Sequence, residues 1–302
     1  MSTQATLFDS AFLAKLEQLH LLARRMFRGD RRAERRSRQT GSSLEFADYR
    51  EYTPGDEPRS IDWNAYGRLD RLFVKLHEQE QDLPVTFLVD CSASMRWMPE
   101  EKADALSKFD HARRLCAALA YIALANLDRV DIHFFAANPL GELGVARGKA
   151  QFHSVLKFLG NAPDADGPTR LLTAARSLTQ RAHRRGLAFV LSDFFDPRGY
   201  EEPLGLLLHG QFEVHALQIL APAELAPAAS GDLSLRDIET GSAMDITADE
   251  KLLRRYRDEI TKFNGALESF CLRRGIAFAQ VTTDSPFEDV VLRALRDGVM
   301  IR

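Results

Sequence analysis

The sequence of 302 residues contains few cysteines and no long apolar run. Its cysteines, Cys91, Cys116 and Cys271, are three in number and no pair has C-x-x-C spacing, so neither a disulfide framework nor a zinc site is indicated. A reduced, cytoplasmic compartment fits this pattern best. The longest nearly apolar stretch, Leu115 to Leu127, is far shorter than the roughly 20 residues of a membrane-spanning helix, so we expect no membrane insertion.

The chain also has no strong excess of one charge. A formal net charge of −3 argues against a general nucleic-acid binder. One basic segment, Arg28 to Arg38, has the composition of a contact for nucleic acid or an acidic partner. We favour a solvated helix end or linker there, because no aromatic residues interleave the arginines. Residues 1–27 carry charges throughout and do not resemble a signal peptide.

From Leu83 onward, strand-like and helix-like segments alternate. This alternation predicts an α/β fold with a mostly parallel central sheet and helices on both faces. The expected strands are 84–89, 130–136, 187–192, 212–220 and 276–281, with a short edge strand at 141–145. The expected helices are 108–127, 151–159, 171–184, 200–209 and 287–295.

We divide the chain into three parts. Residues 1–40 form an N-terminal amphipathic helix, over 8–27, and the basic linker. Residues 41–82 form a polar, turn-rich extension that ends in a strand-like run. Residues 83–302 form the α/β domain, with an insertion near 222–248 that holds a small hairpin, 233–238 and 242–246. Thr247 then begins a long helix, with Glu250 completing a capping box.

The most informative motif follows the first strand of that domain. Phe87-Leu88-Val89 ends in Asp90, and Ser92 and Ser94 follow at alternate positions. An extended loop points both hydroxyls the same way, beside the carboxylate. Such hard oxygen donors are the ligands that Mg²⁺ prefers.

Two later segments supply further oxygen donors. Thr169 lies in a turn just before a helix, and Asp193 ends the buried-type strand 187–192. Strands of a parallel sheet present such residues at one edge, where ligands bind. The alternative interpretation is that Asp90 and Ser92 cap a helix and Asp193 is a turn residue. That interpretation leaves unexplained why Asp90, Ser92 and Asp193 all lie at strand ends. We therefore predict a metal site formed by Asp90, Ser92, Ser94, Thr169 and Asp193.

These five residues resemble a metal-ion-dependent adhesion site on a von Willebrand factor A-like domain. A wider set resembles the signature of the domain of unknown function 58 family, in its short branch without membrane helices. That set is Glu45-Phe46, Tyr49-Arg50-Glu51-Tyr52, Pro54-Gly55-Asp56, Arg59, Ile61-Asp62-Trp63, Arg68 and, after the metal motif, Asp237-Glu239-Thr240-Gly241. The resemblance implies a von Willebrand factor A-like, Rossmann-like fold and a role with a MoxR-type AAA+ ATPase in bacteria, as adaptor or co-chaperone in protein assembly or activation.

Two classes of function remain open. A protein-binding module would use Mg²⁺ or Mn²⁺ with a free coordination position for a partner's carboxylate. A Mg²⁺-dependent phosphate-ester hydrolase is the alternative. A haloacid dehalogenase-like phosphatase has a second aspartate two residues after the first, and here that position is Ser92, which counts against this class. The candidate bases for a hydrolase are His209 and His215. We favour the binding module, and we read His215 as a core histidine.

A cluster in the extension has two interpretations. Its members form either a buried ion-pair network or a contact surface for the ATPase, and they are Arg50, Asp56, Arg59, Asp62 and Trp63.

Overall fold

The computed structural model describes residues 7–30, 46–53, 56, 58, 61–77, 84–98, 106–165, 167–181, 186–227 and 231–296. The chain divides into two compact units, one of residues 1–29 and 83–302 and the other of residues 30–82. The helix α2 (Ser10–Asp30) therefore starts in the larger unit, and the basic residues 31–38 lie outside the described ranges.

A six-stranded sheet is the centre of the larger unit. Its strand order is β10-β7-β6-β3-β4-β5, and every neighbouring pair is parallel except β4 with β5. The expected α/β fold with a mostly parallel sheet is thereby confirmed. The strands are β3 (Pro84–Asp90), β4 (Arg129–Phe135), β5 (Pro139–Arg147), β6 (Leu187–Ser192), β7 (Glu213–Leu220) and β10 (Ala277–Thr282).

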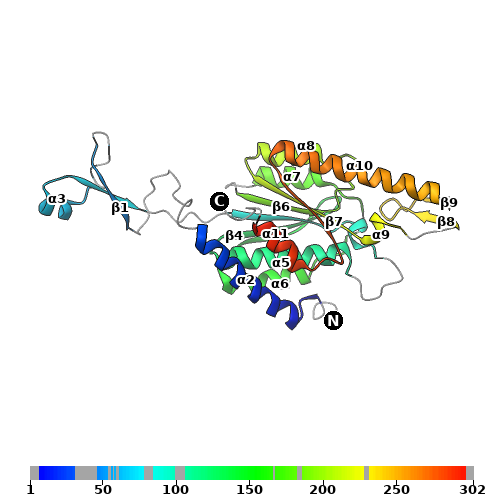
Figure 1. The fold of residues 1–302 in the computed structure, drawn as a ribbon, viewed down its shortest axis with the longest axis horizontal. Helices are drawn as coiled ribbons and strands as arrows, with labels where there is room; N and C mark the ends of the chain where they lie inside the picture. The colour runs from blue at the N-terminus through cyan, green and yellow to red at the C-terminus, as the bar shows by residue number, and fades with distance from the viewer. Residues whose placement is uncertain are drawn as a thin grey trace. The chain divides into compact units, whose positions relative to one another are not determined.

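Helices cover both faces of this sheet, as Figure 1 shows. On one face, a core of buried side chains joins the sheet to α2, α5 (Lys108–Ala125), α6 (Phe152–Gly160) and α11 (Phe287–Arg296). On the other face, a second core joins it to α7 (Leu171–Arg181), α8 (Glu201–His209) and α10 (Glu250–Arg274). The strands β3 and β6 lie between these cores, which explains their nearly unbroken apolar sequences.

The insertion contains a hairpin, as expected. Strands β8 (Gly231–Arg236) and β9 (Ala243–Ala248) pair antiparallel, and the short helix α9 (Pro222–Leu225) precedes them. The predicted start of the following helix was wrong, because Thr247 lies in β9. Helix α10 begins at Glu250, and the side chain of Asp249 caps it by accepting from the Leu252 N–H at 2.6 Å. A carboxylate one residue before the helix is an equally good cap.

The smaller unit contains a two-stranded antiparallel sheet of β1 (Phe46–Glu51) and β2 (Phe73–His77). Between them lies α3 (Trp63–Leu69), which the sequence analysis did not predict. Asp62 is its N-cap and accepts from the Asn64 and Ala65 N–H groups at 2.9 and 3.3 Å. The helix was missed because its seven residues carry no repeated apolar face.

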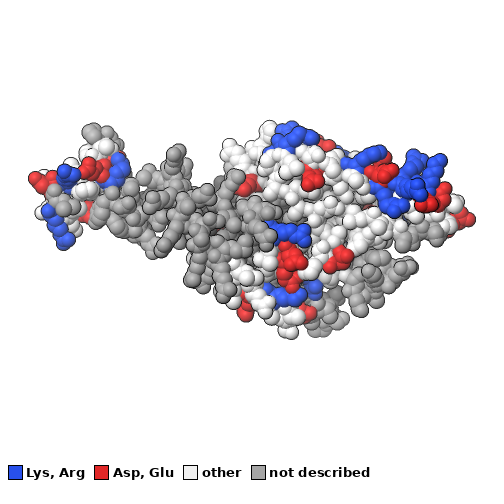
Figure 2. Space-filling view, viewed as in Figure 1, with Lys and Arg blue, Asp and Glu red and all other residues white. Residues whose placement is uncertain are grey.

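Charged side chains of both signs lie interspersed along the exposed side of α10 (Figure 2). Two of its ion pairs, Arg254 with Glu250 and Lys262 with Glu259, join neighbouring turns of the helix. None of the helices in the described ranges has both the length and the apolar character required to cross a bilayer.

Candidate functional site

The first group of donors lies where the central strand β3 ends. Asp90 is fully buried, and its Oδ1 accepts from the Ser92 N–H at 3.0 Å. This contact turns the chain into the short helix α4 (Ala93–Arg96) and brings Ser92 Oγ to 3.1 Å from Ser94 Oγ. Cys91 faces away, as expected of a soft thiol, with its Sγ 3.1 Å from the Phe135 carbonyl oxygen.

Thr169 joins this group from a different loop. Its Oγ1 lies 2.9 Å from Ser92 Oγ and 3.3 Å from Asp90 Oδ2. The loop is fixed on either side of the threonine: Gly167 O accepts from the Ala93 N–H at 3.3 Å, and the Arg170 N–H donates to Ala136 O at 3.1 Å. The structure thus brings four of the five predicted residues into one hydrogen-bonded cluster.

Asp193, the fifth residue, lies near this cluster without hydrogen-bonding to it. It follows β6 and is fully buried, and its Oδ2 accepts from Lys108 Nζ at 2.8 Å. Its Oδ1 accepts from the Phe195 N–H at 3.0 Å. Burial, and secondly the charge of Asp193, raise the pKa of Asp90 to about 7. The negative charge of Asp193 thus disfavours the ionised form of Asp90, whereas Asp193 itself has the Lys108 ammonium beside it.

Two residues that support these carboxylates were not predicted from the sequence. Ser192 Oγ donates to Asp90 Oδ2 at 2.6 Å. Lys108 is buried at the start of α5, and its Nζ contacts both Asp193 and Glu224, a residue of α9. Burial lowers the pKa of Lys108, but the charges of Asp193 and Glu224 outweigh it, so the pKa is raised above its usual value. The sequence around Lys108 contains no pattern that predicts its contact with Asp193, which lies 85 residues further along the chain.

Glu239 is a further residue at the cluster that had no predicted role. Its Oε1 accepts from both the N–H and the Oγ1 of Thr169, each at 3.3 Å, and its side chain also hydrogen-bonds to Ser94. Burial raises its pKa. Glu239 belongs to the family-like stretch at 237–241, but that stretch alone did not show where the carboxylate would point.

The cluster fits the oxygen shell of a small divalent cation. Adjacent ligands at 2.0–2.1 Å from an octahedral Mg²⁺ lie about 3 Å apart. The hydroxyl oxygens of Ser92, Ser94 and Thr169 have separations of 2.9 and 3.1 Å. Within the described residues, no group of three or more His, Cys, Asp and Glu side chains is placed to hold a metal ion. Any ion held here would therefore depend on the hydroxyls as well as on the carboxylates.

The two histidines weighed as bases lie elsewhere. His215 is buried in β7 and stacks on Phe189, with ring centroids 4.9 Å apart, so it is a core histidine as expected. His209 lies at the end of α8, where its Nδ1 is 3.0 Å from Gly205 O.

The described residues of the predicted cluster in the smaller unit differ in their burial. Arg50 and Asp56 make an ion pair at 2.7 Å on the surface, and the Thr53 N–H and Arg50 lower the pKa of Asp56 to about 2. Asp62 is buried as the cap of α3, whereas Trp63 is 63% exposed. Arg59 lies outside the described residues.

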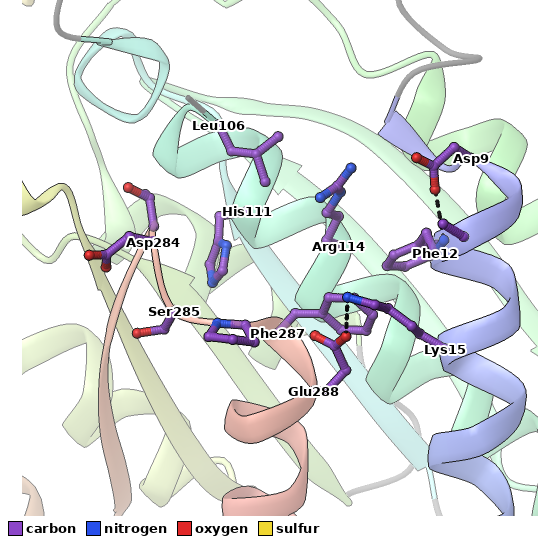
Figure 3. Close-up of a pocket in the computed structure, with 13 residues that line it drawn as sticks. Asp9, Phe12, Lys15, Leu106, His111, Arg114, Asp284, Ser285, Phe287 and Glu288 are labelled. Carbon is purple, nitrogen blue, oxygen red and sulfur yellow. Dashed lines mark hydrogen bonds and ion pairs between the residues drawn. The ribbon is translucent and has the colours of Figure 1, made fainter. Parts of the chain in front are cut away.

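A separate cavity of about 310 Å³ lies between α2, the start of α5 and the loop before α11 (Figure 3). Figure 3 shows His111 and Arg114 of α5 and Glu288 of α11 around it, with Lys15 of α2 paired to Glu288. None of the five predicted metal residues lines this cavity.

The fold and the cluster define a doubly wound α/β protein with a carboxylate–hydroxyl site at the carboxyl ends of its strands. The chain belongs to the protein family of unknown function DUF58, which it matches over residues 48–264.

Similar proteins occur in mycobacteria. The chain is 25% identical to the uncharacterized protein Rv1480 of Mycobacterium tuberculosis (strain ATCC 25618 / H37Rv) over 246 residues, which cover 81% of this chain and 76% of that protein. It is 32% identical to the uncharacterized protein MAV169 of Mycobacterium avium over 117 residues, 38% of this chain and 66% of that one.

Two solved structures from Bacteroides are also similar. The conserved hypothetical protein BatB from Bacteroides thetaiotaomicron has a TM-score of 0.45 and 14% identity, covering 72% of this chain and 98% of that one. An aerotolerance-related membrane protein from Bacteroides fragilis has a TM-score of 0.44 and 14% identity, covering 71% and 99%.

Proposed function

We propose that this protein is a von Willebrand factor A-like, metal-dependent protein-binding module. Asp90, Ser92, Ser94, Thr169 and Asp193 would hold Mg²⁺ or Mn²⁺, directly or through water, and a partner's carboxylate would complete the shell. The observation that carries the proposal is the set of three mutually hydrogen-bonded hydroxyl oxygens, of Ser92, Ser94 and Thr169, that contacts the buried Asp90 through Thr169. Hard oxygen donors with few charges favour Mg²⁺ and leave it partly hydrated, so a ligand from another molecule can enter.

The local structure supports binding better than hydrolysis. A phosphate-ester hydrolase would need a nucleophile or a base at the cluster. His209 and His215 lie away from it and Lys108 is tied to two carboxylates, which leaves the carboxylates of Asp90, Asp193 and Glu239 as the groups that could act as a base. A phosphatase assay of the purified protein separates the two functions, because metal-dependent turnover would favour the hydrolase. The partner we propose is a MoxR-type AAA+ ATPase or its client in the cytoplasm, with this chain as adaptor or co-chaperone; the support is membership of the DUF58 family.

The metal site is tested by calorimetry with Mg²⁺ and Mn²⁺. We expect wild type to bind one ion and Asp90→Ala to lose binding, because the replacement removes the carboxylate at the centre of the cluster. Asp245→Ala is the matched control, since Asp245 is an exposed carboxylate of β9 and should not affect binding. Equal affinity of wild type and Asp90→Ala would reject the site.

The partner is tested by a pull-down with a MoxR-type ATPase from the same organism. EDTA, Asp90→Ala and Thr169→Ala should each weaken the complex by roughly 2–5 kcal/mol, the scale for removing one side of a desolvated charge contact. Alanine replacements across Arg31–Arg36 should change mainly a salt-sensitive association rate. Full binding in EDTA would show that the complex does not depend on a metal ion and that the interface lies elsewhere on the chain.

A further inference from the structure

We propose that Glu239 is an internal ligand of the metal site, a tethered carboxylate that holds the position a partner's carboxylate takes. In the free protein, Glu239 would then occupy the coordination position that a partner's carboxylate takes. The β8–β9 hairpin would have to move before a partner binds. This inference rests on the proposed metal-dependent function and adds a regulatory step to it.

The contacts of Glu239 place its carboxylate on the open side of the cluster. Asp90, Ser92 and Thr169 are buried, whereas Ser94 is only half-buried and is the donor nearest the solvent. Glu239 Oε1 lies 3.3 Å from Thr169 Oγ1, and its side chain hydrogen-bonds to Ser94. A separation of about 3 Å from a neighbouring donor oxygen is that of adjacent ligands on one small ion.

The turn that carries Glu239 is ordered by its own hydrogen bonds. Asp237 Oδ1 accepts from the Glu239 N–H at 2.8 Å and from the Thr240 N–H at 2.9 Å. The Gly241 N–H donates to Asp237 O at 2.8 Å, and Gly241 adopts a φ of +73°, which glycine tolerates without strain. The carboxylate is therefore presented in a fixed direction, which lowers the entropy cost of its binding.

The hairpin itself is weakly attached to the rest of the unit. Among the residues of β8 and β9, Ala248 is the one that is buried, and Leu233 and Ile246 are half-buried. Figure 1 shows the hairpin at one end of the larger unit, beside the start of α10. Elements with few buried apolar contacts open at low free energy. The hairpin can therefore withdraw Glu239 while the two cores of the sheet stay intact.

The experiment compares Mn²⁺ binding by wild type, Glu239→Ala, Asp245→Ala and Asp90→Ala. Water-proton relaxation reports both the affinity and the number of water molecules on the ion. Asp245 lies on the same hairpin and is exposed, so its variant controls for the loss of one negative charge. Glu239→Ala should bind Mn²⁺ roughly 10-fold more weakly and show more water on the ion. Acetate, as a free carboxylate, should then displace that water in Glu239→Ala and have little effect in wild type.

Each result separates this inference from the proposed function. Equal affinity and equal hydration in wild type and Glu239→Ala, with binding lost in Asp90→Ala, would keep the metal site and reject Glu239 as a ligand. Binding by Glu239→Ala alone would make Glu239 a plug that excludes the ion, which also contradicts the inference. No Mn²⁺ binding by any variant would reject the metal site and the inference together. Thermal denaturation of each variant checks that it is folded.

Discussion

Lys108 has an ammonium group in the protein interior, between the carboxylates of Asp193 and Glu224. The lysine begins α5, Asp193 follows β6, and Glu224 lies on α9. The three residues therefore tie the first turn of one helix to the edge of the sheet where the candidate site lies. An ion pair of this kind contributes little net stability when intact, but losing one partner leaves buried charge uncompensated.

We therefore predict that Lys108→Met destabilises the protein by roughly 3–5 kcal/mol. Urea denaturation in EDTA measures the loss without any contribution from divalent ions. Lys262→Met is the matched control, because Lys262 pairs with Glu259 on the exposed side of α10 and its replacement should leave stability nearly unchanged. Equal effects of the two substitutions would contradict the buried pairing.

His111 is a second buried group with an unusual setting. It lines the cavity in Figure 3, and its Nε2 has no hydrogen-bond partner among the described residues. Burial, and secondly the charge of Arg114, lower the pKa of His111 to about 4, with Asp284 acting in the opposite direction. The histidine is therefore neutral in the folded protein near neutral pH.

This pKa predicts that acid weakens the fold. Because the folded pKa lies below the usual value of 6.5, the contribution of His111 to stability is fully present above about pH 6.5 and is lost as the pH falls toward 4. Between about pH 7.5 and pH 5, wild type should lose about 2 kcal/mol more than His111→Gln. Urea denaturation at both pH values measures the difference; parallel losses would show that His111 titrates normally.

At the level of elements, the approach of β6 to β3 depends on a glycine. Gly186 immediately precedes β6, and a Cβ atom there would lie 2.0 Å from the Pro84 backbone oxygen at the start of β3. Only a residue without a side chain allows the two central strands to pair from their first residues. The pairing matters for the site, since these strands carry Asp90 and Asp193 at their other ends.

Gly186→Ala should therefore destabilise the protein by about 1–3 kcal/mol, because the backbone of β3 must shift. Gly205→Ala is the control: Gly205 lies within α8 with open space around its Cα, so alanine should stabilise by about 0.5–1 kcal/mol. Thermal denaturation should show a lower melting temperature than wild type for Gly186→Ala and a higher one for Gly205→Ala. Stabilisation by both would show that the strands are not in close contact at Gly186.

The sequence predicted the elements of the large unit well where the pattern was long and periodic. All six strands of the sheet lie within two residues of their expected starts. For β3 and β6 the signal was strongest, because burial on both faces produces apolar runs that end in turns. The clustering of Asp90, Ser92, Ser94 and Thr169 followed from strand ends meeting at one edge. Lys108, Glu224 and Glu239 could not be predicted, since each reaches the site through tertiary packing across 70 or more residues of chain.

For the whole molecule, metal binding and folding should be linked. An ion that binds the folded chain and not the unfolded one stabilises it by about 1.4 kcal/mol for each tenfold rise of free ion above its dissociation constant. We predict that Mg²⁺ raises the unfolding free energy of wild type in this way and that EDTA reverses it. Asp90→Ala should show no such dependence, and an equal Mg²⁺ effect on that variant would indicate binding elsewhere.

The contact between α2 and α11 has a consequence for the order of folding during synthesis. The rings of Phe12 and Phe287 are in tilted contact, with centroids 4.8 Å apart. Phe12, Leu16 and Leu19 belong to the same buried core as Val290 and Val291. Helix α5 can cover part of the apolar face of α2 early in synthesis, but the part around Phe12 that faces Phe287 can be covered only after α11 has been made. Until then that part stays exposed to water, so nascent chains stalled before residue 287 should be captured by chaperones that bind apolar segments.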